Sequence, residues 1–211
     1  MKIIGMFWFY FLALGVSGYA IFAYGFFPLG SLVHPDMKVV YLAHQAGIYT
    51  HIFASAVALT LSPFQFTAGL RNRWPQVHRM IGRTYLGVGV ALGGLSGLYM
   101  SVHAFGGPVA KIGFAGLALC WLFTGVCAFL AIRRGEVQEH RKWVVRNVSL
   151  TLAAVTLRIY LPSSMVAGIP FEVAYPVIAW LCWVPNLVVA ELLFNKSGRG
   201  LLKLKQMRGL A

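Results

Sequence analysis

Residues 3–28 read IIGMFWFYFLALGVSGYAIFAYGFFP and contain no charged side chain. A transmembrane α-helix needs about 20 mostly apolar residues to cross the hydrocarbon core of a bilayer. This run is long enough to do so, and it is longer than the apolar core of a cleavable signal peptide. We therefore expect the first membrane-spanning helix at about residues 4–27.

The same criterion finds five further apolar segments along the chain. They lie at about residues 39–62, 75–104, 112–132, 139–161 and 171–195. The sequence thus predicts an all-α fold, a six-transmembrane-helix bundle that forms a single membrane domain over residues 1–211. Residues 196–211 are rich in lysine and arginine, and we expect them to form a basic cytoplasmic tail lying on anionic lipid.

The composition agrees with a membrane protein. Of the 211 residues, 59% are hydrophobic and only 11% are charged, whereas soluble domains carry about a quarter charged residues. The three cysteines all lie inside apolar segments, which favours buried, unreactive thiols over a disulfide framework. The sequence contains no P-loop, no dinucleotide-binding glycine pattern and no HExxH motif, so it indicates no particular enzyme class.

The distribution of basic residues predicts the orientation in the membrane. If the N-terminus is inside, 15 of the 18 lysines and arginines fall on the cytoplasmic side, and only Lys38, Lys111 and Arg158 fall on the other. Cytoplasmic loops are enriched in these residues, so both termini are expected to be cytoplasmic. The net charge of +13 is spread over short loops between apolar runs, which predicts a lipid bilayer as the partner rather than nucleic acid.

Two histidines, His78 and His140, lie about one turn into the two spans that both enter from the cytoplasmic side. Imidazoles at equal depth on facing helices can clamp a flat macrocycle, which is the geometry of a b-type haem with two axial histidines. The haem propionates would be neutralised by arginines at the same level, namely Arg79, Arg83, Arg141 and Arg146. The alternative is that all these residues simply meet water and lipid headgroups at the interface.

Three ionisable residues further inside the spans call for an explanation, namely His51, Arg158 and Glu191. His51 falls about 18 Å into the second span, near mid-membrane, where it either hydrogen-bonds across helices or ligates a cofactor. Arg158 lies about one turn from the outer end of the fifth span. It either snorkels outward or binds an anionic headgroup, a quinone oxygen or a carboxylate. Glu191 is expected to pair with Arg146 or Arg141.

A further group lies near the outer surface. Met100 and His103 share a helix face, and His44 is expected at a similar depth, so the three could form a soft metal site, for example for copper. Packing is the more ordinary role for a methionine. Gly93 and Gly97 form a GxxxG pattern, which predicts close helix packing or room for a flat cofactor.

Four motifs together carry a family resemblance. They are GLR at 69–71 with HRMIGRTY at 78–85, HRKWVVR at 140–146, VTLRIY at 155–160, and WLCWVPNL at 180–187 followed by Glu191. In combination they resemble a bacterial family of predicted multi-helix membrane proteins catalogued as a domain of unknown function. The resemblance covers roughly the second to the sixth span and implies a multi-pass protein of the bacterial cytoplasmic (inner) membrane.

A more distant similarity is to the di-haem cytochrome b membrane proteins. In their ascorbate-reducible branch one haem lies between the third and fifth helices, which is where His78 and His140 fall. The second haem lies between the second and fourth helices. His51 could supply one ligand, but the fourth span has no histidine, so His103 or an unusual ligand would be needed. The resemblance implies a b-type cytochrome-like protein that binds haem b and has an electron-transfer or redox role, with a quinone as partner.

The alternative function is a cofactor-free transporter, or an assembly or scaffold subunit of a larger respiratory or membrane complex. Pro176, Pro185 and the glycine-rich third span would suit a helix break. In a transporter, His51, Arg158 and Glu191 could line a polar path.

Overall fold

In the computed structural model, which describes residues 3–192, every regular element is a helix. The elements are α1 (Ile3–Phe26), α2 (Pro35–Ala43), α3 (Gln45–Leu61), the 3-10 helix η1 (Pro63–Phe66), α4 (Ala68–Arg73), α5 (Pro75–Thr84), the π-helix η2 (Tyr85–Leu92), α6 (Gly93–Ser101), α7 (Gly107–Arg133), α8 (Val137–Thr151), α9 (Ala153–Val166) and α10 (Phe171–Leu181). After a turn, residues 184–192 continue α10 as helix. The prediction of an all-α bundle is confirmed.

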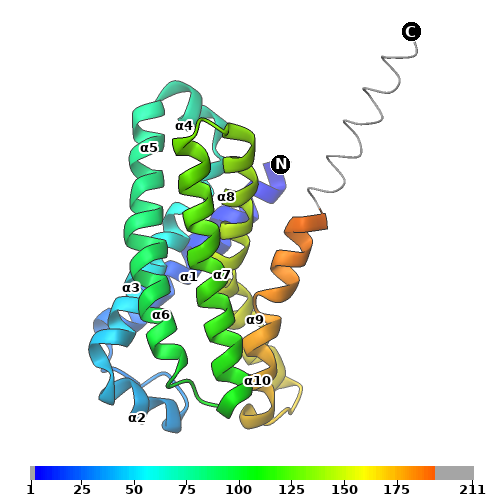
Figure 1. Ribbon diagram of the computed structural model, residues 1–211. Coiled ribbons are helices and arrows are strands. Elements are labelled where there is room, and N and C mark those ends of the chain that lie inside the picture. Colours follow the sequence, from blue (N-terminus) through cyan, green and yellow to red (C-terminus); the bar gives the residue numbers. More distant parts are fainter. Residues whose placement is uncertain (1–2, 193–211) are drawn as a thin grey trace, which may run out of the picture.

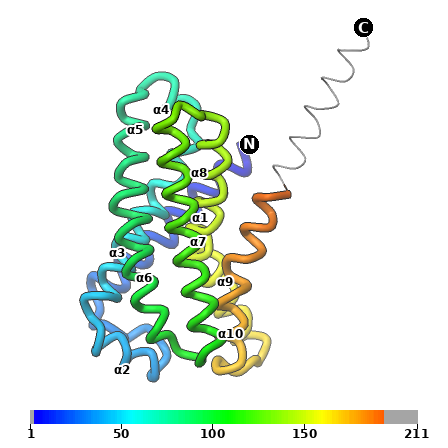
Figure 2. Tube along the Cα trace, viewed as in Figure 1, coloured from blue at the N-terminus to red at the C-terminus, as the bar shows by residue number. Residues whose placement is uncertain are grey.

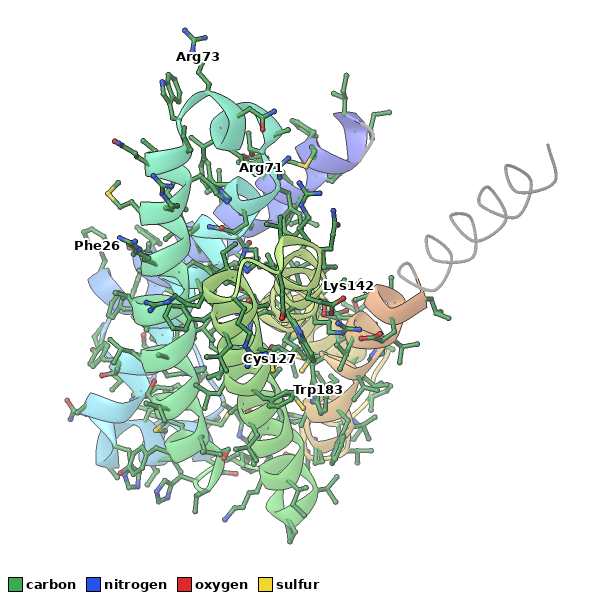
Figure 3. All side chains as sticks on the ribbon, turned by 45° about the horizontal axis from the view of Figure 1, so that its top comes forward. Phe26, Arg71, Arg73, Cys127, Lys142 and Trp183 are labelled. Carbon is green, nitrogen blue, oxygen red and sulfur yellow. The ribbon has the colours of Figure 1, made fainter. Side chains whose placement is uncertain are left out.

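The chain runs back and forth along one axis (Figure 1), and the tube in Figure 2 shows the same path. One end of the bundle holds α4, the start of α5, the end of α7 and the start of α8. We name it the arginine end, because Arg71, Arg73, Arg79, Arg133 and Arg134 lie there. Figure 3 shows Arg73 projecting from the α4 corner. The opposite end, which we name the α2 end, holds α2, the end of α6 and the starts of α7 and α10.

Five helical stretches of the described chain are long and apolar enough to cross a membrane, compared with the six expected. They are Ile3–Phe26, Gln45–Phe66, Gly107–Arg133, Val137–Val166 and Phe171–Leu192. The third expected span, 75–104, is helical from Pro75 to Ser101 but is divided into α5, η2 and α6. A π-turn changes the helical register, so no single helix there reaches the length of a span. The chain is a multi-pass membrane protein.

Several predicted boundaries differ from the structure. The second span was expected from residue 39, but His44 separates the short α2 from α3. Pro162 was expected to end the fifth span, yet it lies inside α9, which continues to Val166. Neighbouring helices can satisfy the backbone groups that a proline frees, so a membrane helix tolerates it. The last residues of the sixth expected span and the basic tail, 193–211, lie outside the described residues.

The glycines of η2 and α6 set how closely these elements approach α3. A Cβ atom added at Gly89 would lie 2.7 Å from the Cβ of Ala58, and one added at Gly93 would lie 3.0 Å from Ser55 Oγ. Such contacts require a residue without a side chain. The packing interpretation of the GxxxG pattern is therefore confirmed.

A buried polar network joins η2, α7 and α8 near the middle of the bundle. The Tyr85 hydroxyl donates to Asn147 Oδ1 at 2.6 Å, and Asn147 Nδ2 donates to the Trp121 carbonyl at 2.7 Å and to Thr124 Oγ1 at 2.8 Å. Trp121 Nε1 in turn donates to Thr151 Oγ1 at 2.9 Å. Polar groups in hydrocarbon need such partners, so this network fixes the three helices against one another.

Candidate functional site

A cavity of about 640 Å³ lies inside the bundle and extends from the α2 end to its middle. Residues of α1, α2, α3 and α6 to α10 contribute to its wall, which is mainly aliphatic and aromatic. Binding sites for small molecules are commonly cavities of about 300–1,000 Å³ with apolar walls and a few polar groups. The polar groups of this wall therefore define what the cavity can bind.

His51 is one of these polar groups. Its Nδ1 lies 2.9 Å from the carbonyl oxygen of Gly93, and because a carbonyl can only accept, Nδ1 carries the proton. Gly97 allows this position, since a Cβ there would lie 2.8 Å from the imidazole ring. The predicted hydrogen bond across helices is thus confirmed. It leaves the lone pair of Nε2 as an acceptor or ligand on the cavity wall.

Arg158 lines the same cavity from α9. Its Nη1 donates to the Ala154 carbonyl of its own helix at 3.0 Å, and the guanidinium lies 5.9 Å from the centre of the Tyr19 ring. Within residues 3–192 no acidic side chain forms an ion pair with it. A cation among apolar groups without a counter-charge is energetically costly, which makes Arg158 a candidate functional residue.

Four hydroxyl groups of the wall also have free hydrogen-bonding capacity. Tyr24, Tyr41 and Tyr175 line the cavity, and no hydrogen bond joins their hydroxyls to other described residues. Ser55 Oγ is buried and has no partner in the described part of the chain. Each hydroxyl can both donate and accept, and the Arg158 guanidinium can only donate, so the wall can supply several donors to an anionic or acceptor-rich ligand. Sequence reasoning missed these residues, although a tyrosine in an apolar span is a signal in itself, because its hydroxyl needs a partner.

His44 and His103, which were expected near the outer surface, are in contact with each other. The rings of His44 and His103 stack with centroids 3.8 Å apart, and His44 Nδ1 is hydrogen-bonded to the Tyr99 hydroxyl at 2.7 Å. His103 and Met100 both line the cavity. No group of three or more histidine, cysteine or acidic side chains that could hold a metal ion is found in residues 3–192. The copper-type site on these residues stays a prediction.

His78 and His140 lie together at the arginine end. His140 Nδ1 donates to the Ala128 carbonyl of α7 at 2.8 Å, while Nδ1 of His78 is buried without a hydrogen-bond partner in the described chain. An axial histidine commonly donates Nδ1–H to a carbonyl and binds iron through Nε2, so His140 fits this role. His78 fits less fully, because nothing fixes its ring in that way.

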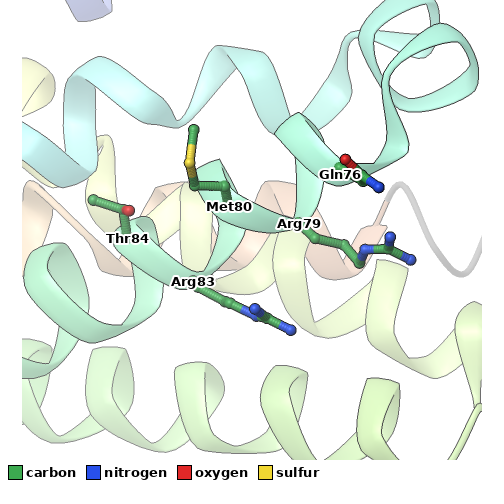
Figure 4. A pocket seen from close by; sticks show the side chains of 5 residues that line it. All are labelled: Gln76, Arg79, Met80, Arg83 and Thr84. Atoms are coloured by element: carbon green, nitrogen blue, oxygen red, sulfur yellow. The ribbon is translucent and has the colours of Figure 1, made fainter.

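The four arginines predicted to neutralise haem propionates do not surround a single site. Arg146 is bonded to Glu191 through Nε and, at 2.9 Å, through Nη2, which confirms the predicted ion pair. Arg79 and Arg83 line a hollow on the surface of α5 that includes neither histidine (Figure 4). Arg141 is exposed on α8.

Fold and cavity together define this chain as a multi-pass helical membrane protein with an internal cavity. Residues 48–194 match the family described as "Predicted membrane protein (DUF2306)", and the chain belongs to that family. The matched region runs from α3 onward and includes His51, His78, His140 and Arg158. Neither a curated protein nor a solved structure matches the chain. The family resemblance is confirmed, and the more distant similarity to di-haem cytochromes b stays a prediction.

Proposed function

We propose that this protein binds, within the bilayer, a lipophilic molecule whose polar head is an anion or a hydrogen-bond acceptor. The observation that carries the proposal is the Arg158 guanidinium, which faces a largely apolar cavity and has no acidic partner among the described residues. A bound head group would supply the missing counter-charge or acceptor, and the apolar wall would hold the rest of the molecule.

Quinones are the ligand class that best uses the groups of this cavity. A quinone oxygen accepts from Arg158 or from a tyrosine hydroxyl, whereas the hydroxyl of the reduced quinol donates to an acceptor such as His51 Nε2. A carboxylate or phosphate head would use Arg158 but not the lone pair of His51. This difference favours a quinone over a fatty acid.

Titration of the purified full chain with a menaquinone or ubiquinone analogue tests the proposal. Trp121 lines the cavity, so binding is expected to quench its fluorescence. We expect Arg158→Gln to weaken binding at least about tenfold, because a hydrogen bond to a charged group is lost. The matched control is Arg134→Gln, which removes an exposed arginine at the opposite end. Equal affinity in wild type and Arg158→Gln would refute the proposal.

We further propose that α5, η2 and α6 together form one more crossing, which gives six crossings with both termini in the bacterial cytoplasm. The direction of the chain in Figure 1 and the position of Lys38 and Lys111 at the α2 end support this orientation. Arg73→Cys is expected to react with an impermeant thiol reagent only from the inside, and Lys111→Cys only from the outside. Labelling from the reverse sides would contradict it.

A second candidate function is electron transfer through a haem b held by His78 and His140. The hydrogen bond from His140 Nδ1 to the Ala128 carbonyl, together with the position of His78 at the same end of the bundle, favours it. The haem would supply one-electron chemistry, and the protein would orient its ligands. A reduced-minus-oxidised visible spectrum of the purified chain is expected to show a Soret and an α-band that His140→Ala removes. A flat spectrum would end this candidate.

The same purified protein distinguishes the two cofactor-free alternatives, a transporter and a scaffold or assembly subunit. A transporter would bind its substrate in the cavity and show no visible spectrum. A scaffold or assembly subunit would co-purify at fixed stoichiometry with a larger membrane complex.

A further inference from the structure

A second site lies on α5, well away from the cavity. Gln76, Arg79, Met80, Arg83 and Thr84 line an open hollow on its surface, and the two arginines extend to the same side of the helix (Figure 4). They are four residues apart, so they are neighbours one turn apart on the helix. No described acidic side chain forms an ion pair with either of them.

The position of this hollow along α5 corresponds to the headgroup region of a membrane. Trp74, just before α5, is 56% exposed, and Arg73 lies 5.4 Å above its ring. Exposed tryptophans of this kind lie at membrane interfaces. After Arg83 the chain has no further charged residue until Lys111, so α5 continues directly into an apolar segment. At about 1.5 Å per residue, Arg83 lies about 14 Å along the helix from Trp74, which is still close to the interface.

We propose that this hollow binds the phosphate of an anionic phospholipid from the leaflet at the arginine end. The planar guanidinium groups of Arg79 and Arg83 can each donate two parallel hydrogen bonds to phosphate oxygens. Gln76 and Thr84 add further donors at either end of the hollow. Met80 is 61% exposed on the same stretch and offers an apolar contact for an acyl chain.

The positive charge of the hollow determines which lipid headgroup it prefers. Two arginines without acidic neighbours favour a headgroup of net charge −1, such as phosphatidylglycerol. A zwitterionic headgroup brings its own ammonium group into the same positive field, which repels it. The proposal is independent of what binds in the cavity, because no residue lines both sites.

The test is native mass spectrometry of the delipidated full chain with phosphatidylglycerol or phosphatidylcholine. We expect the wild type to retain phosphatidylglycerol preferentially, and Arg79→Gln/Arg83→Gln to reduce this preference about tenfold or more. The matched control, Arg133→Gln/Arg134→Gln, removes the same charge at the same end and is expected to keep the preference. Arg79→Lys/Arg83→Lys retains charge without the planar donors and is expected to give an intermediate value.

Two outcomes would overturn the proposal. One is an equal loss of preference in the control, which would mean that only the total charge matters. The other is full displacement of phosphatidylglycerol by millimolar inorganic phosphate, which would make the hollow a site for free phosphate. The melting temperature of each variant is measured alongside. If the melting temperatures are unchanged, the lost preference for phosphatidylglycerol is assigned to the hollow. If the preference is lost only in a variant that has unfolded, the result counts against the proposal.

Discussion

At the scale of single residues, the position of His51 depends on a residue that has no side chain. Gly97 on α6 lies against the imidazole, where an added Cβ would come within 2.8 Å of the ring. We expect Gly97→Ala to displace the ring, to weaken its bond to the Gly93 carbonyl and to reduce binding of a quinone analogue several-fold. Gly87→Ala is the control, because a Cβ there meets nothing within 4 Å. Equal effects of the two substitutions would show that helix propensity, and not contact with His51, is responsible.

The pair of Arg146 and Glu191 leads to a residue-scale prediction about stability. Both nitrogens of the planar fork bond the carboxylate, and the Arg146 side chain is 19% exposed while that of Glu191 is 43% exposed. Glu191→Gln is expected to lower the unfolding free energy by up to about 1 kcal/mol, since solvent screens a partly exposed pair. Glu139→Gln, which breaks the more exposed pair with Lys142, is expected to cost less. Thermal unfolding in detergent measures both changes.

At the scale of elements, Asn147 connects α8 to α7 and η2. Asn147→Ala removes the hydrogen bonds that this side chain makes to the Tyr85 hydroxyl, the Trp121 carbonyl and Thr124, while Tyr85 keeps its bond to Thr151 Oγ1. An intramolecular hydrogen bond contributes about 0.5–1.5 kcal/mol net, so we expect a loss of roughly 2 kcal/mol and a clearly lower melting temperature. Asn72→Ala on the exposed α4 is the control and is expected to be nearly neutral. If both variants unfold at the same temperature, the network does not hold these helices together.

The elements also show what hydropathy can and cannot predict. Long apolar runs predicted the positions of α1 and α7 closely, because the length of a span depends only on composition and bilayer thickness. The division of residues 75–101 into α5, η2 and α6 was not predictable in this way. Within η2, Gly89 packs closely against Ala58 on α3, and such a contact between segments far apart in sequence does not show in hydropathy. The expected end of the fifth span before Pro162 was wrong because a proline does not always end a membrane helix, and α9 continues past it to Val166.

At the scale of the whole molecule, the cavity is a property of the assembled bundle. The sequence singled out His51 and Arg158 individually, because polar residues in apolar spans stand out. It did not predict that they share one cavity with Tyr24, Tyr41 and Tyr175, because these residues come from five different helices. That His78 and His140 lie at the same end of the bundle was easier to predict, because it follows from depth and chain direction alone.

Because so many helices contribute to the cavity wall, a ligand there is expected to stabilise the whole fold. A molecule that binds only the folded state adds about 2.7 kcal/mol to the unfolding free energy when its concentration is 100 times Kd. We therefore expect a quinone analogue to raise the melting temperature of the wild type by several degrees. With binding weakened about tenfold, Arg158→Gln should lose about half of this increase at the same concentration, whereas Arg134→Gln, at the opposite end, should keep it. Equal stabilisation of both variants would mean that the analogue partitions into the detergent or binds elsewhere, and Arg158 would then be a buried cation whose counter-charge must be sought outside the cavity.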